Sequence, residues 1–183
     1  MKSIYIFGVS MILVTFVYAA AGAEVLSSNA AGFQILIKKE TKAEAQDVYD
    51  AIVSDFSKWW DSAHSFSGDA NNLSMDMEKG CMLEKLPNGG FVRHLEIVHC
   101  DPGKTLRLTG GLGPLQEMGV HGALTYKLVE EDGKTEIQLV YNVFGFNGLQ
   151  LDKVAPAVDR VLEEQAERLK KLCDSATVAG DGN

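Results

Sequence analysis

The sequence predicts an α+β domain in which a curved antiparallel sheet of seven strands packs around a long C-terminal helix. Three observations predict this fold. Segments between residues 73 and 144 alternate apolar and polar residues with a period of two, which is typical of strands. Short turn sequences separate these segments, so neighbouring strands are expected to pair antiparallel. From about Asp152 the apolar residues recur at spacings of three and four, which is typical of an amphipathic helix.

The first 23 residues have the order of a secretory signal. Lys2 supplies a positive charge, residues 4–17 form an almost uncharged apolar run, and Ala21-Gly22-Ala23 is an A-x-A cleavage site. The run is short for a transmembrane helix, which needs about 20 residues, although an uncleaved anchor is the alternative. We therefore expect a periplasmic or secreted protein that starts near Glu24 and has no membrane span after cleavage.

The composition limits the remaining function classes. About 160 residues follow the signal (183 − 23 = 160), which is enough for one core and too few to suggest two domains. The formal net charge of −8 becomes −9 when the signal, with one lysine and no acid, is removed. An acidic chain without a Lys/Arg cluster argues against nucleic acid as a partner. No Cys/His spacing suits zinc, and no cofactor is expected.

Three cysteines, Cys81, Cys100 and Cys173, are expected to be buried free thiols. Their odd number leaves at least one unpaired. A hairpin that turns at residues 87–90 sets Cys81 opposite Glu96, four residues short of Cys100. Four strand residues span about 13 Å, which is beyond the reach of a disulfide.

The elements follow in order along the chain. Residues 32–40 are dense in β-branched and apolar residues and predict the first strand. Thr41 and Glu44 have the spacing of a capping box, and the apolar stripe after them predicts a helix. Residues 56–60 can add a second short helix before a polar loop at 61–72. The other strands are expected at 73–78, 81–86, 91–100, 105–112, 120–130 and 135–144.

The C-terminal helix has the clearest pattern in the chain. Asp152 can cap it, and Pro156 falls early enough to be tolerated in or near the first turn. The domain is expected to span residues 24–174, and the small polar residues 175–183 to form a disordered tail. The apolar stripe consists of Val154, Val158, Val161, Leu162, Ala166, Leu169 and Leu172.

The central hairpin carries the polar residues with the most suggestive chemistry. Its turn places Glu84 opposite Arg93 and Leu83 opposite His94. Glu84 and Arg93 then share one face, while His94 and Glu96 point to the other. Facing a cavity, the Glu84–Arg93 pair could anchor a ligand carboxylate or hydroxyl. Facing solvent, it would be a surface ion pair worth about 0–1 kcal/mol. Both faces also carry apolar residues, so the alternation leaves both orientations open.

Catalysis has no motif in this sequence. G-x-S-x-G and H-E-x-x-H are both absent. His94, Glu84 and Arg93 are weak candidates for polarising or proton-transfer groups, with His94 and Glu96 on the same side of the strand. A single histidine on a half-buried strand is more often structural, and His121 is expected on the outer face.

Two further regions suggest a ligand cavity. Trp59 and Trp60 cannot both face the same core from a helix end, so one indole is expected at a cavity rim; the alternative is a partly buried lid without a ligand. The glycine-rich residues 110–114 lack the ending of a phosphate loop and could bring Leu115 and Met118 toward the cavity opening, or form a plain loop. The candidate ligand-binding residues are Trp59, Trp60, Met82, Glu84, Arg93, Leu115 and Met118.

Five segments share the pattern of a known family: FSKWW at 56–60, EKLPNGG at 84–90, VRH at 92–94, DPGKTLRL at 101–108 and GPLQEMGV at 113–120. They resemble the START/birch-allergen-like superfamily, the helix-grip fold also called SRPBCC. Within that superfamily, the segments are most similar to the bacterial domains called heat-shock-ATPase-activator-like and polyketide-cyclase-like. The resemblance spans nearly the whole mature chain and implies a hydrophobic ligand cavity between the sheet and the C-terminal helix. It implies no single chemistry, because such folds host carriers, cyclases, hydrolases and co-chaperone domains.

Three functions follow, in this order. The first is an exported binding or carrier protein that holds a small apolar or amphipathic ligand in the cavity. The second is a cyclase, dehydratase or hydrolase that uses the same cavity. The third is a protein-interaction module. The inward or outward direction of Glu84, Arg93 and His94 separates the first two, and the sequence leaves the oligomeric state open.

Overall fold

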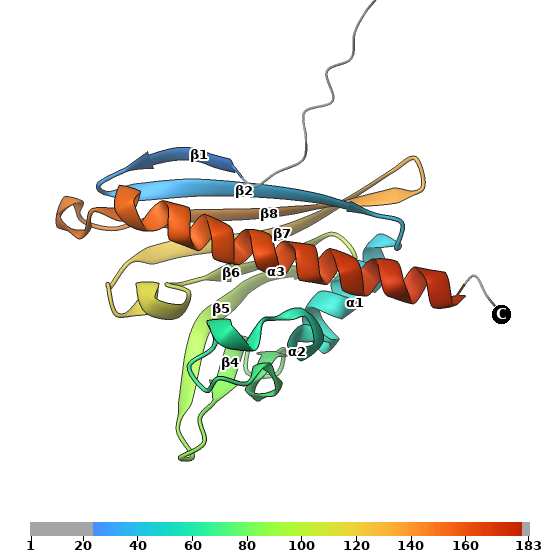
Figure 1. The fold of residues 1–183 in the computed structure, drawn as a ribbon, viewed down its shortest axis with the longest axis horizontal. Helices are drawn as coiled ribbons and strands as arrows, with labels where there is room; N and C mark the ends of the chain where they lie inside the picture. The colour runs from blue at the N-terminus through green and yellow to red at the C-terminus, as the bar shows by residue number, and fades with distance from the viewer. Residues whose placement is uncertain (1–23, 181–183) are drawn as a thin grey trace, which may run out of the picture.

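The computed structural model describes residues 24–180, in which a single antiparallel sheet of eight strands packs against a long helix, α3 (Leu151–Gly180). The strand order is β1-β2-β8-β7-β6-β5-β4-β3, and α3 crosses one face along β2 (Figure 1). The predicted signal, residues 1–23, lies outside the described residues. The strands are β1 (Glu24–Asn29), β2 (Gly32–Thr41), β3 (Leu73–Asp76), β4 (Cys81–Lys85), β5 (Phe91–Asp101), β6 (Thr105–Thr109), β7 (His121–Glu131) and β8 (Lys134–Phe144).

The α+β class and the antiparallel meander are confirmed, but the prediction of seven strands is wrong. The missed strand is β1, which pairs only with β2 at the edge of the sheet. Most of its residues are exposed, and its register shifts between Val25 and Ser27. An edge strand that buries no continuous face leaves no alternation of apolar residues in the sequence.

Between β2 and β3 the chain forms α1 (Ala45–Ser54), α2 (Phe56–Trp59) and two short 3₁₀ helices, Ser62–His64 and Ala70–Asn72. The two 3₁₀ helices lie in the segment predicted as a polar loop. The predicted capping box does not form, because Thr41 is the last residue of β2 and α1 begins only at Ala45. The Ala45 N–H donates instead to a Glu130 carboxylate oxygen at 2.9 Å, a contact between distant parts of the chain.

Helix α3 contributes much of the core. One set of its residues is buried against the sheet and the short helices: Leu151, Ala155, Leu162, Ala166, Leu169 and Cys173. The helix continues to Gly180, so the prediction of a disordered tail from residue 175 is wrong for residues 175–180. The hydroxyls of Ser175 and Thr177 in this last part of the helix donate to carbonyls four residues earlier. No described helix is both long and apolar enough to cross a membrane.

A β-bulge in β5 changes the register of the central hairpin. Cys81 pairs with Glu96, as predicted, and Met82 pairs with Leu95. Beyond this point Leu83 lies opposite Arg93, so His94 is an extra residue without a cross-strand partner. A bulge of one residue exchanges the faces of all residues beyond it. The predicted pairing of Glu84 with Arg93 is therefore wrong.

All three cysteines are free, as predicted. Cys81 and Cys173 are buried, whereas Cys100 is exposed, which corrects the expectation of three buried thiols. The Cys100 sulfur lies 2.7 Å from the hydroxyl of Tyr49 on α1.

Candidate functional site

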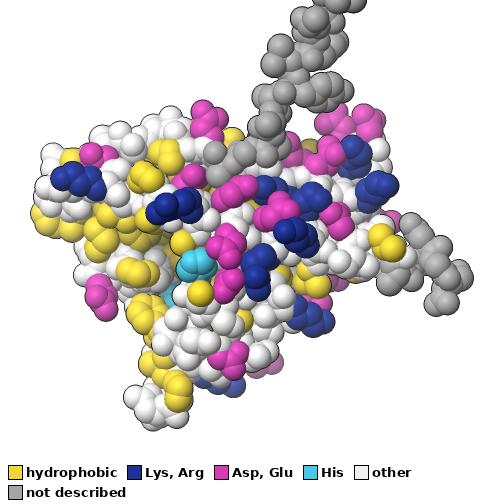
Figure 2. All heavy atoms as spheres, viewed as in Figure 1, with side chains coloured by type: hydrophobic (Ala, Val, Ile, Leu, Met, Phe, Trp, Pro, Cys, Tyr) yellow, Lys and Arg dark blue, Asp and Glu magenta, His cyan; other side chains and the backbone are white. Residues whose placement is uncertain are grey.

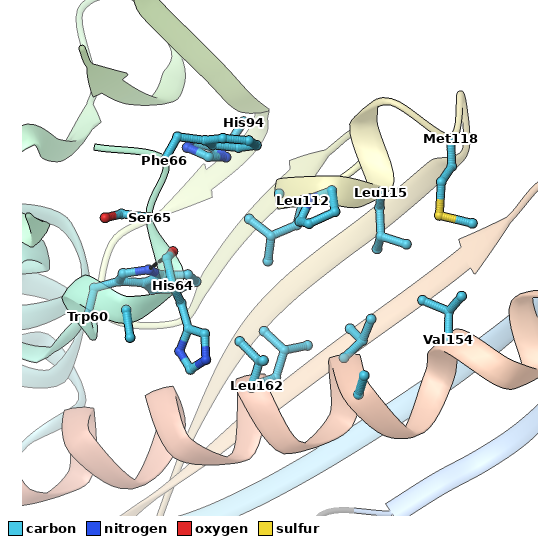
Figure 3. A pocket seen from close by; sticks show the side chains of 16 residues that line it. Trp60, His64, Ser65, Phe66, His94, Leu112, Leu115, Met118, Val154 and Leu162 are labelled. Atoms are coloured by element: carbon cyan, nitrogen blue, oxygen red, sulfur yellow. Dashed lines mark hydrogen bonds between the residues drawn. The ribbon is translucent and has the colours of Figure 1, made fainter. Parts of the chain in front are cut away.

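A cavity of about 430 Å³ lies between α3 and the loop that joins β6 to β7. The apolar side chains of α3 form one wall, the loop forms the opposite wall, and the segment after α2 closes one end (Figure 3). Figure 2 shows apolar side chains gathered between the start of α3 and this loop, with histidine atoms beside them. The lining consists of Trp60, Ala63, His64, Ser65, Phe66, His94, Leu112, Gly113, Pro114, Leu115, Met118, Val154, Ala157, Val158, Val161 and Leu162.

The cavity exists because the sheet turns away from α3. Strands β4 and β5 diverge from the helix, while β1 and β2 run beside it (Figure 1). The predicted apolar stripe of α3 is therefore divided between two environments. Ala166 and Leu169 are buried away from the cavity, whereas Val154, Val158 and Val161 are only half-buried and line it. Apolar side chains that the core covers only in part leave a surface that a ligand can cover.

The opposite wall is held by Tyr141 on β8. Its hydroxyl accepts a hydrogen bond from the Leu112 N–H at 3.0 Å and donates one to the Gly110 carbonyl at 3.1 Å. Burial raises the pKa of Tyr141 to about 12, which keeps this hydroxyl protonated. A Cβ at Gly111 would lie only 2.9 Å from backbone atoms of Leu115, so the tight loop requires glycine there. These contacts place Leu115 on the cavity.

Both tryptophans are buried in the same core cluster, with ring centroids 5.7 Å apart, so the expectation that they cannot share one core is wrong. The Trp59 indole donates to the Ala51 carbonyl at 3.0 Å and packs edge-on against Tyr126 in the core. Trp60 stacks on Phe56 with ring centroids 5.1 Å apart, and its indole donates at 2.9 Å to the carbonyl of His64. Trp60 lines the cavity, whereas Trp59 does not.

The orientation of His64 is set from α3. The Asp61 N–H donates to the Gln165 side-chain oxygen at 2.7 Å, so the amide nitrogen of Gln165 faces the imidazole. That nitrogen lies 3.0 Å from His64 Nδ1 and donates to it. Neutral His64 therefore carries its proton on Nε2, and it adds a hydrogen-bond donor to the cavity lining.

The bulge brings His94 to the same side of the sheet as Glu84. Both side chains are buried, with exposed fractions of 5% and 0%, and His94 Nε2 lies 2.8 Å from the Glu84 carboxylate. The carboxylate also accepts the backbone N–H groups of Phe66, at 3.2 Å, and Ser67, at 2.5 Å. Burial raises the pKa of Glu84, but the hydrogen bonds from Ser67, His94 and Phe66 outweigh burial and hold the pKa below its usual range.

The remaining sequence-predicted residues divide between the cavity and other places. Leu115 and Met118 line the cavity, while Met82 is buried without lining it. Arg93 is exposed and bonds to Glu96 at 3.2 Å, so it is a partner neither of Glu84 nor of the cavity. The expected placement of His94 and Glu96 on one face is also wrong. The bulge turns His94 inward, whereas Glu96 stays exposed. His121 is exposed, as predicted.

Sequence reasoning missed the contribution of residues 61–67. This segment supplies His64 and Phe66 to the cavity and two backbone N–H groups to Glu84. Backbone donors leave no trace in a sequence. The one available signal was Gln165, a polar residue among the buried positions of α3, where an unpaired amide would be costly. No group of side chains suited to hold a metal ion occurs among residues 24–180.

Comparisons with known proteins show the fold. No family model and no curated protein matches the sequence. A crystal structure of a Mesorhizobium loti protein matches with a TM-score of 0.57 and 14% identity, covering 78% of this chain and 97% of that chain. A solution structure from Arthrobacter aurescens matches with a TM-score of 0.54 and 14% identity, covering 83% and 93%. A crystal structure from Rhodobacter sphaeroides gives a TM-score of 0.53 and 13% identity, covering 86% and 98%.

Proposed function

We propose that this protein binds a small, predominantly apolar molecule in the cavity between α3 and the loop that joins β6 to β7. The observation that carries the proposal is the cavity itself, whose volume of about 430 Å³ is lined by valine, leucine, methionine and aromatic side chains. Ligand sites in proteins typically have about 300–1,000 Å³ and an apolar lining with a few polar groups. The side chains of His64, Ser65 and His94 are the polar groups of this lining.

Membership of the helix-grip (SRPBCC) superfamily is part of this proposal. It is supported by the five sequence segments that resemble the superfamily and by the order of an antiparallel sheet followed by a long C-terminal helix. In that fold, the space between sheet and helix is the expected place for a hydrophobic ligand.

Export to the periplasm or the outside of the cell is also proposed. It rests on the signal-like sequence of residues 1–23.

Native mass spectrometry of the protein purified from its own host tests these proposals together. We expect the mass of a chain that begins near Glu24. We also expect an additional mass from a bound ligand, which disappears when the protein is denatured. A protein that carries no ligand from its host and that takes up no apolar probe would contradict the binding proposal. An intact N-terminus would contradict cleavage of the signal and would leave the binding proposal untouched.

A second candidate function is an enzyme of cyclase, dehydratase or hydrolase type. The observation that favours it is the inward direction of Glu84 and His94, because a carboxylate that orients an imidazole is the usual partner of a general base. Arg93 has no part in this candidate, since it is exposed. The two candidates differ in whether the bound molecule leaves the cavity unchanged.

The released host ligand distinguishes a carrier from an enzyme. We expect the ligand to keep its mass and chromatographic retention when it is incubated with fresh wild-type protein. A change that occurs with wild-type protein and that is at least tenfold slower with His94→Gln would favour the enzyme instead.

A further inference from the structure

The cavity lining contains one buried polar atom without a partner. His94 lines the cavity and is 5% exposed, and its Nδ1 has no hydrogen-bond partner. Among the described residues, two more buried side-chain atoms have no partner. Both are carboxylate oxygens, of Asp159 and Glu163, and neither residue lines the cavity. A buried acceptor without a donor is costly, and native proteins rarely keep one without a function.

Glu84 determines what His94 Nδ1 can bind. The hydrogen bonds to the carboxylate lower its pKa, so Glu84 is ionised at neutral pH and can only accept hydrogen bonds. Neutral His94 therefore carries its proton on Nε2, where it donates to Glu84. Its Nδ1 keeps a free lone pair, and a group that satisfies this atom must donate a proton.

The surroundings of His94 favour a neutral donor. No lysine or arginine lines the cavity, so nothing there neutralises an anionic ligand. The Glu84 carboxylate lies directly behind the imidazole and would repel a ligand anion. Phe66 lies over the imidazole, with ring centroids 5.7 Å apart and an interplanar angle of 28°. Phe66 is 50% exposed, so it loses little packing when it moves aside.

We propose that the ligand is a neutral, predominantly apolar molecule that carries a hydroxyl group, and that this hydroxyl donates a hydrogen bond to His94 Nδ1. This inference rests on the proposed binding function, because it assigns the chemical class of the ligand for the same cavity. A neutral N–H group could donate in the same way, but a carboxylate could not. His94 is thus a specificity-determining residue, and Glu84 is a positioning residue that acts through it.

Three naphthalene derivatives test this assignment. 2-Methylnaphthalene offers no polar group, 2-methoxynaphthalene can only accept, and 2-naphthol can donate. Binding is followed by NMR through the indole N–H signal of Trp60, which lines the cavity, with Trp59 as the internal reference. All three probes are expected to shift the Trp60 signal, and 2-naphthol to bind roughly three- to tenfold more tightly than 2-methoxynaphthalene.

The variant Glu84→Gln reverses the role of His94 while preserving the shape of the side chain. The glutamine orientation that keeps the shorter hydrogen bond, from the Ser67 N–H at 2.5 Å, gives up the one from the Phe66 N–H at 3.2 Å. Its amide nitrogen then donates to His94 Nε2, which moves the ring proton to Nδ1. Both oxygenated probes can accept from such a donor. We therefore expect the preference for 2-naphthol to disappear in Glu84→Gln and to persist in His121→Gln, which changes an exposed histidine.

Each outcome has one reading. If wild-type protein binds 2-naphthol and 2-methoxynaphthalene with equal affinity while binding 2-methylnaphthalene, the hydroxyl assignment is wrong and the apolar cavity remains. If none of the probes shifts Trp60, the binding proposal fails and the assignment fails with it. If Glu84→Gln does not fold, the ring ¹⁵N signals of wild-type His94 decide. They should show the Nε2–H form and a change at Nδ1 with 2-naphthol only, and the opposite tautomer would overturn the assignment.

Discussion

Replacing Glu84 by alanine is expected to lower the free energy of unfolding by about 3–5 kcal/mol, which is typical for the loss of one partner of a buried charged contact. The Glu84 side chain is fully buried and satisfies three donors: His94 Nε2 and the N–H groups of Phe66 and Ser67. Alanine would leave all three donors unpaired, and each unpaired buried group costs about 1–3 kcal/mol. Relaxation of the loop at residues 61–67 would let water reach some of them, which keeps the total below the sum.

Chemical denaturation of wild-type protein, Glu84→Ala and Glu96→Ala measures this effect. Glu96 is the matched control, because its bond to Arg93 lies on the exposed side of the same hairpin and is worth about 0–1 kcal/mol. Equal losses in the two variants would mean that Glu84 does not hold the loop and the bulge together.

The contribution of Glu84 is also expected to depend on pH. Because the pKa of Glu84 is lower in the folded chain, the unfolded chain binds its proton more tightly. The carboxylate therefore stabilises the fold fully above the ordinary glutamate pKa of about 4.3, and this stabilisation is lost as the pH falls through the lower folded value. The difference in stability between wild-type protein and Glu84→Gln, which does not titrate, should shrink over that acidic range.

Replacing Val158 by phenylalanine is expected to weaken the binding of 2-methylnaphthalene at least tenfold. Val158 is half-buried in α3 and faces the cavity, so the larger ring would occupy the space of the ligand. Because the ring fills existing space, overpacking is avoided and the free energy of unfolding should change by less than about 1 kcal/mol. This combination of lost binding and kept stability identifies the cavity as the binding site.

The control is Arg160→Phe, which adds the same ring to an exposed position of α3. Both variants are titrated with 2-methylnaphthalene by the Trp60 signal, and both are unfolded with urea. Wild-type affinity in Val158→Phe would place the binding site elsewhere on the protein.

Much of the fold could be predicted because it depends on local patterns. Strands β2, β3, β6, β7 and β8 alternate buried and more exposed residues along their length, and turn sequences such as Asp132-Gly133 separate neighbouring strands. The stripe of α3 was correct as a pattern, although its end was placed too early. Strand β1 was missed because an exposed edge strand needs no apolar face.

The site was predicted less well, because its geometry depends on contacts between distant residues. Leu115, Met118 and Trp60 were expected beside a cavity and do line it. The predicted polar pair was wrong: a regular hairpin sets Glu84 opposite Arg93, whereas the bulged hairpin brings Glu84 together with His94. No local propensity marks His94 as the residue that bulges.

The sequence by itself determined the α+β class, the antiparallel pairing of consecutive strands from β3 to β8 and the apolar face of α3, because hydrophobic periodicity and turn residues act over a few neighbouring positions. Only the tertiary structure decided which charge of the hairpin is buried. A one-residue bulge turns His94 inward, where the buried carboxylate of Glu84 and the ring of Phe66 receive it, and leaves Arg93 in solvent. That choice depends on burial and hydrogen bonding among segments far apart in the chain, and it gives the apolar cavity its one unpaired acceptor.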